Sequence, residues 1–186
     1  MPLGAVTDIS RQRIDKLYPG IRPIAFRVLN DIRILSGRGM NIVQGVRSFD
    51  EQARLYAIGR TLVGIQWVIS DSPKIVTNAR PGLSWHCYGL AFDCAWQGFD
   101  PYLRNESVTT KDGLWSQYAS VVRSHGMIAG HDHRLINGVI DKPHAEMSYG
   151  FTIGQALELH SIGGIHAVWA YCDKLRGVEE GEGWKS

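Results

Sequence analysis

Apolar residues recur every three or four positions in three stretches of the chain, and this spacing predicts three amphipathic helices. The stretches are roughly 23–36, 48–58 and 112–125, and a glycine follows each of them. Ser48 and Glu51 have the spacing of a capping box, which marks the start of the second helix. We expect each helix to pack its apolar stripe against a common core.

Shorter runs in which apolar and other residues alternate predict β-strands. The expected strands are 41–46, 88–95, 127–129 and 139–140, the last two joined through a polar turn at 131–138. In the second strand, alternation places Asp93 on the same side as the small residues Gly89 and Ala91. A carboxylate with small neighbours has room beside it for a metal ion.

The connection 61–81 contains two β-leaning pieces, 65–69 and 74–77, and we expect it to form a hairpin or a flap. After Thr152 the pattern predicts two helices broken at Gly163-Gly164, followed by a frayed end rich in glycine and glutamate. These elements predict an α+β fold, in which helices flank a small antiparallel sheet and further helices follow at the C-terminus. We expect residues 1–186 to form a single domain.

Composition narrows the function classes. The net charge of +2 over 186 residues does not indicate a nucleic-acid-binding protein, and the apolar runs are too short to span a bilayer. Three cysteines without a CxxC pair argue against a disulfide framework. Met1 to Gly4 lacks the pattern of an export signal, so we expect synthesis in the cytoplasm and no stable membrane insertion.

Candidate chemistry lies in two segments, 84–93 and 141–144, which supply two imidazoles and two carboxylates. His86, Asp93 and His144 form a mixed nitrogen and oxygen ligand set, which suits zinc and leaves a fourth position for water. The seven-residue separation of the first two differs from the HExxH pattern, so the metal is expected between a loop and a strand, at the sheet.

Asp141 is the surplus carboxylate, three residues before a proposed ligand. It is a candidate general base towards water and a general acid towards a leaving amine. Arg47 lies at a predicted strand-to-helix junction, where it could hold a substrate carboxylate or stabilise an oxyanion. Two readings of the metal stay open, a catalytic site and a structural site that stabilises the fold.

Two motifs resemble a known family. Ser84-x-His86-x-x-Gly89-x-Ala91-x-Asp93 and Asp141-x-x-His144-x-Glu146 resemble the signature of VanY-type zinc peptidases, which include D-Ala-D-Ala carboxypeptidases. Segments 45–52, 59–61 and 75–79 are similar to the bacteriophage endolysins of this family that act as L-alanyl-D-glutamate endopeptidases. The resemblance covers about 17–147 and leaves 151–186 as a helical extension.

The resemblance implies zinc held by His86, Asp93 and His144, a catalytic Asp141 and a catalytic or substrate-binding Arg47. It implies hydrolysis of the L-alanyl-D-glutamate bond of peptidoglycan by a monomer that acts at the cell wall once the host membrane is permeabilised, and so lyses the cell. Ser84, Gln52 and His133 are expected to contact substrate. At 130–133 the chain departs from the family pattern, because His133 replaces an expected substrate-lining tryptophan.

Alternative readings concern both function and individual residues. A D,D-carboxypeptidase of the same family and a non-catalytic, zinc-stabilised wall-binding domain are the alternative functions. Glu146 is either an acceptor for a ligating imidazole or an ordinary surface residue. His131 and His133, two positions apart, form a second candidate pair of metal ligands.

Overall fold

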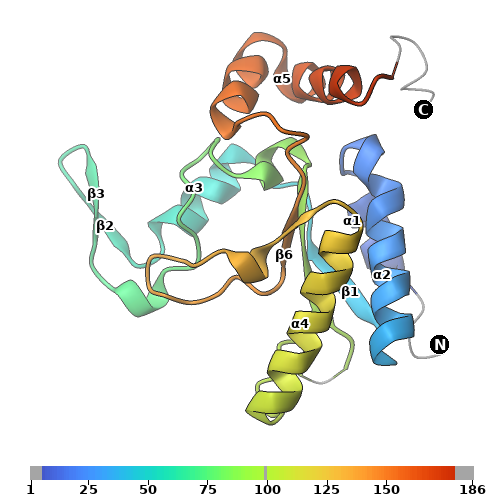
Figure 1. The fold of residues 1–186 in the computed structure, drawn as a ribbon. Coiled ribbons are helices and arrows are strands. Elements are labelled where there is room, and N and C mark those ends of the chain that lie inside the picture. The colour runs from blue at the N-terminus through green and yellow to red at the C-terminus, as the bar shows by residue number, and fades with distance from the viewer. Residues whose placement is uncertain (1–5, 99, 179–186) are drawn as a thin grey trace.

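A four-stranded antiparallel sheet forms the centre of the protein in the computed structural model, which describes residues 6–98 and 100–178 (Figure 1). Its order is β1-β4-β6-β5, with β1 at Met40–Gln44, β4 at Ala91–Trp96, β6 at His144–Glu146 and β5 at Ile128–Ala129. All neighbouring strands are antiparallel. The predicted α+β class with a small antiparallel sheet is therefore confirmed.

Within the described residues, five α-helices surround this sheet: α1 Asp8–Ile14, α2 Arg22–Ser36, α3 Phe49–Ala57, α4 Val108–Ser124 and α5 Ile153–Leu175. Figure 1 shows α2 and α4 on one side of the sheet, α3 on the other, and α5 across one end. Short 3₁₀ helices lie in the connections: η1 Pro19–Ile21, η2 Ser72–Lys74, η3 Trp85–Tyr88 and η4 Gly130–Asp132. Across the described ranges, no helix has the length and apolar character needed to cross a membrane.

The helix boundaries follow local capping chemistry. The Ser48 side chain accepts a hydrogen bond from the Glu51 amide and starts α3 where the sequence predicted. Ser107 caps α4, so this helix begins four residues earlier than the apolar stripe indicated. Non-helical dihedral angles at 163–164 divide α5 as predicted, whereas the frayed end predicted after residue 178 lies outside the described residues.

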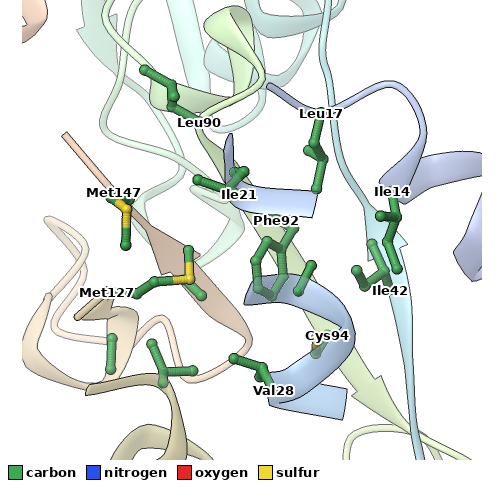
Figure 2. Packing of buried hydrophobic residues seen from close by; sticks show 14 of the residues in the cluster. Ile14, Leu17, Ile21, Val28, Ile42, Leu90, Phe92, Cys94, Met127 and Met147 are labelled. Atoms are coloured by element: carbon green, nitrogen blue, oxygen red, sulfur yellow. The ribbon is translucent and has the colours of Figure 1, made fainter. Parts of the chain in front are cut away.

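The core lies between the sheet and the helices on one side of it (Figure 2). Phe92 and Cys94 of β4 and Ile42 of β1 are fully buried and face apolar residues from α1, η1 and α2. The cysteines Cys87, Cys94 and Cys172 are buried and free, so the expectation of no disulfide framework is confirmed. Burying this apolar surface holds β4 in place, and β4 carries part of the site.

The strand predicted at 139–140 was wrong. Segment 139–140 forms no strand; Ile140 makes only an isolated bridge to Arg134. The sheet instead receives β6, which apolar alternation did not reveal because its sequence is His-Ala-Glu and it is only three residues long. β4 also starts at Ala91 rather than Tyr88, because η3 occupies the preceding residues. Helix α1 was not predicted either.

The predicted hairpin exists, but its two strands are not the two pieces that the sequence indicated. β2 (Arg60–Val63) pairs with β3 (Gln66–Ile69), and Gly64 at φ 61° supplies the two-residue turn. The piece 74–77 is not a strand, since η2 ends at Lys74 and the chain continues without regular structure. The hairpin projects away from the sheet in Figure 1, and its strand residues are almost all exposed.

Gly89 is a position where the fold needs glycine. Its φ is +68°, and an added Cβ would lie 3.1 Å from the Tyr18 amide nitrogen. Gly37, at φ +70°, has no atom within 4 Å of its Cβ position. Gly37→Ala is expected to cost about 1 kcal/mol of unfolding free energy, and Gly89→Ala about 2–5 kcal/mol because overpacking is added. Urea unfolding in the presence of a chelator measures both; equal costs would contradict the crowding at Gly89.

Candidate metal centre and adjoining cavity

Three predicted ligands converge on one point. Asp93 Oδ1 lies 3.2 Å from His86 Nε2 and 3.0 Å from His144 Nδ1. The two imidazole nitrogens are 3.2 Å apart. Among the described residues this trio is the grouping of histidine, cysteine or acidic side chains that could hold a metal ion.

The pairing register of β4 with β6 brings two of the candidate metal ligands together. Asp93 on β4 and His144 on β6 are directly opposite residues in the antiparallel ladder, where side chains on one face lie close together. Asp93 also pairs with Gln44 of β1, at a bulge between Ile42 and Gln44. Bulges change the direction of strands and are common beside functional sites.

The third ligand is held by backbone contacts. His86 lies in η3, its Nδ1 is 2.8 Å from the Gly45 carbonyl oxygen, and its own carbonyl accepts a hydrogen bond of 3.0 Å from the Arg47 amide. Tyr88 at the end of η3 accepts a hydrogen bond of 2.7 Å from Trp169 Nε1 on α5. The orientation of His86 therefore depends on the backbone at 45–47, which connects β1 to α3, and on α5.

The outer sides of the rings face hydrogen-bond acceptors. His86 Nδ1 faces the Gly45 carbonyl, and His144 Nε2 lies 2.8 Å from Glu146 Oε2. When the imidazoles are neutral, as metal ligands are, these outer nitrogens carry the hydrogens. The inner nitrogens then present lone pairs toward Asp93 Oδ1. Three acceptors facing one another need a cation, and this donor set fits a divalent metal.

The electrostatics of the cluster support this fit. Burial alone would raise the pKa of Asp93, yet the neighbouring imidazoles of His86 and His144 lower it well below its usual range. Burial would lower the pKa of His144, but hydrogen bonds to Asp93 and Glu146 raise it to about 10. An environment that favours positive charge this strongly on a buried imidazole also favours a metal ion.

A cavity of about 780 Å³ opens beside the cluster. Of the site residues predicted from the sequence, its lining contains all but Gln52: Arg47, Ser84, His86, Asp93, His133, Asp141 and His144. Burial raises the pKa of Asp141, His144 opposes the rise, and Asp93 adds to it. Asp141 therefore combines access to the cavity with increased basicity.

Arg47 is buried and faces Asp93, with Nη2 3.6 Å from Oδ2. Its Nη1 donates a hydrogen bond of 2.7 Å to Gln52 Oε1. Gln52 is fully buried and donates through Nε2 to Thr77 Oγ1 at 3.3 Å and to the Ala79 carbonyl at 2.7 Å. Its contacts are thus with the protein, and they fix the guanidinium. The substrate contact expected of Gln52 remains a prediction.

Glu146 and His133 also have defined places. Glu146 Oε2 lies 2.8 Å from Nε2 of the candidate ligand His144, so Glu146 is not an ordinary surface residue. His133 lines the cavity with its ring centroid 6.4 Å from that of His144. His131 and His133 are not part of the metal-capable grouping within the described residues.

Sequence reasoning missed the residues that connect the two rims of the cavity. Asn78 Nδ2 donates to the Arg134 carbonyl at 3.3 Å and its Oδ1 accepts from the Ile136 amide at 2.9 Å. Asn137 Nδ2 donates to the Ile75 carbonyl at 3.0 Å. Each asparagine lies in a stretch without periodicity, so no local signal revealed these contacts. They order two long loops that face the site.

Gly130 allows the segment containing Asp141 and His144 to approach η4. A Cβ at this position would lie 2.2 Å from the Asp141 carbonyl oxygen and 2.5 Å from His144 Cβ. Tyr118 of α4 donates a hydrogen bond of 3.1 Å to the Pro143 carbonyl and holds the same segment from its other side. Position 130 therefore requires glycine for a steric reason.

Together, the fold and the cluster define a candidate metal-binding site beside a cavity. A family model described as D-alanyl-D-alanine carboxypeptidase matches residues 77–147, a range that contains the three candidate ligands and Asp141. The chain is also 34% identical over 121 residues to the peptidoglycan L-alanyl-D-glutamate endopeptidase CwlK of Bacillus subtilis. The predicted resemblance to the VanY-type peptidase family is confirmed by these matches.

The extent of each likeness differs. The alignment with the Bacillus subtilis protein covers 60% of this chain and 64% of that protein, so the chain spans less than two thirds of the relative's length. The chain is also similar to the crystal structure of the Serratia marcescens L-Ala D-Glu endopeptidase ChiX, with a TM-score of 0.47 and 16% identity. That comparison covers 77% of this chain and 89% of the other.

Removing the negative charge behind His144 should weaken metal binding. Glu146→Gln is expected to lower the affinity for a divalent ion about 10- to 100-fold, because a neutral amide replaces the carboxylate that orients the imidazole and raises its basicity. Calorimetric titration with zinc measures the change. Glu158→Gln, at an exposed position of α5, is the control and should bind as the unaltered protein does. Equal affinities in both variants would exclude the supporting role.

The pairing of Arg47 with Gln52 should appear as coupling in protein stability. We expect the double-mutant cycle of Arg47→Met and Gln52→Leu to give a coupling of about 1–3 kcal/mol in unfolding free energy, because either change leaves a buried polar partner unpaired. Urea unfolding of metal-free protein measures it. The cycle of Arg47→Met with Gln66→Leu, an exposed glutamine on β3, should show none.

Proposed function

We propose that this protein is a zinc-dependent peptidoglycan endopeptidase that hydrolyses the L-alanyl-D-glutamate bond. One observation carries the proposal: three ligand atoms converge at the edge of a cavity that also exposes Asp141 and Arg47. A purely structural metal site has four protein ligands and no use for an adjacent basic carboxylate. The name of the Bacillus subtilis relative supports the substrate class.

Zinc is the metal that the ligand atoms support best. Tetrahedral zinc with nitrogen and oxygen ligands at about 2.0–2.1 Å places neighbouring ligand atoms about 3.3 Å apart. The separations here are 3.0, 3.2 and 3.2 Å. Bound there, zinc would polarise the scissile carbonyl and lower the pKa of water to about 7.

Two side chains would perform the remaining chemistry. Asp141 accepts a proton from the attacking water and returns it to the amine of D-glutamate as the C–N bond breaks. Its raised pKa, caused by burial, suits both steps. Arg47, fixed by Gln52, donates to the carbonyl oxygen as negative charge develops there, or to a substrate carboxylate.

A D,D-carboxypeptidase is the second candidate, favoured by the description of the matching family. The two activities cut different bonds, so mass spectrometry of digested muropeptides separates them. The proposed function predicts fragments that begin with D-glutamate. Loss of the terminal D-alanine alone would establish the carboxypeptidase.

The biological setting is part of the same proposal. We propose that the enzyme is a bacteriophage endolysin that functions as a monomer, is made in the host cytoplasm, and lyses the cell after the membrane is permeabilised. The similarity of segments 45–52, 59–61 and 75–79 to endolysin motifs supports this reading. Turbidity loss of permeabilised cells tests lysis, and addition of a zinc chelator should abolish it.

The catalytic role of Asp141 separates an enzyme from a zinc-stabilised wall-binding domain. Asp141→Asn is expected to lower the rate of muropeptide hydrolysis by about 10²–10⁴-fold, because proton transfer is lost, while zinc content stays the same. The acid limb of the pH–rate profile should lie above the usual aspartate range and disappear in this variant, since burial raises the pKa of Asp141.

The control for this prediction is Asp132→Asn. Asp132 is exposed, pairs with Arg123 at 2.6 Å and does not line the cavity. Its replacement should leave hydrolysis unchanged. Full activity of zinc-loaded Asp141→Asn would show that Asp141 has no catalytic role.

A further inference from the structure

A second cavity, of about 490 Å³, adjoins the catalytic cavity. Its lining contains four cationic and two aromatic side chains: Arg104, Lys111, Arg134, Lys142, Tyr102 and Trp115. Tyr102, Arg134 and Pro143 line both cavities, so the two share a wall. A ligand seated in the catalytic cavity can therefore extend into this second one.

Positive charge dominates the second cavity. No carboxylate lines it, and within the described residues Arg104, Lys111 and Arg134 form no ion pair. Lys142 pairs with Asp112 at 2.6 Å. Asp112 and Asp100 lie near the cations but outside both linings. The lining therefore carries more cations than the surrounding carboxylates neutralise.

The side chains are held in place by contacts other than strong ion pairs. The Arg104 guanidinium lies over the Tyr102 ring, 5.5 Å from its centroid. Arg134 Nη1 donates to the Gly138 carbonyl at 3.3 Å, and its backbone bridges Ile140. Neither contact neutralises the charge, so both guanidinium groups remain able to bind an anion.

The proposed substrate has its anions on one side of the scissile bond. Both backbone groups of L-alanine are in amide linkages within the wall, so this side offers no carboxylate. D-Glutamate keeps one free carboxylate after joining the next residue, and a stem peptide that is not cross-linked through its end terminates in another. Carboxylates therefore occur only on the D-glutamate side.

We propose that this second cavity is a subsite for the carboxylates of the stem peptide that lie beyond D-glutamate. The inference rests on the proposed function, because it places the scissile bond in the adjoining cavity. Arg47 is too deeply buried and too firmly paired to serve carboxylates several residues away. Arg104 and Lys111 stand outside the metal cluster and its cavity, and supply charge along the extended peptide.

Binding of a product peptide tests the subsite without turnover. The probe is a tripeptide that begins with D-glutamate and ends in a free carboxylate, and its counterpart is the same tripeptide with a C-terminal amide. Calorimetry with zinc-loaded protein compares the unaltered chain with the double variant Arg104→Ala/Lys111→Ala. The control double variant, Lys16→Ala/Arg27→Ala, removes two exposed cations elsewhere.

We expect the double variant to raise the Kd of the acid peptide about 2- to 25-fold, since each accessible ion pair contributes about 1.4- to 5-fold. The amide peptide should bind both proteins more nearly alike, the control variant should bind like the unaltered chain, and added salt should shrink the difference. Unchanged binding of the acid peptide, or equal weakening of both peptides, would overturn the subsite.

Hydrolysis of muropeptides distinguishes a failure of the subsite proposal from a failure of the proposed function. If L-alanyl-D-glutamate bonds are cut and the double variant binds the acid peptide normally, only the subsite is wrong. If no such bond is cut, the proposed function is wrong; charge-dependent peptide binding would then mark the cavity as an anion site without that reaction.

Discussion

Convergence of three hydrogen-bond acceptors in a partly enclosed space is the constraint on which the site depends. Two imidazole nitrogens and a carboxylate oxygen, all within about 3 Å of one another, lie this close only when a proton or a metal ion sits among them. The protein tolerates this arrangement because the outer nitrogens are fixed by Gly45 and Glu146. The cluster is therefore preorganised for a metal rather than assembled by it.

The surrounding fold supplies the rigidity that such preorganisation requires. Asp93 and His144 occupy paired positions of a sheet whose other face is covered by the core. His86 is held by hydrogen bonds from backbone groups around 45–47, and η3 is further tied to α5. Several parts of the fold thus hold the candidate ligands in place. Such support keeps the geometry of a site fixed.

Charge is distributed unevenly around the site. Near the metal position, carboxylates hold and tune the histidines, and Asp141 remains basic because it is buried. Further along the shared wall, the lining changes to arginine and lysine. The proposed substrate, which is neutral on one side of the scissile bond and anionic on the other, matches this gradient, and the match would fix its binding direction.

Local sequence determined the elements whose signals are local. Helical periodicity and caps gave α2, α3 and the break in α5, and the motif residues gave the three candidate metal ligands as a set. Tertiary structure decided the rest. β6 exists because pairing with β4 and β5 stabilises three residues that have little strand character of their own. The contacts of Gln52 with Thr77 and Ala79 and the lining of the cationic cavity join segments that are distant in the chain. Local sequence patterns do not show which distant side chains will meet.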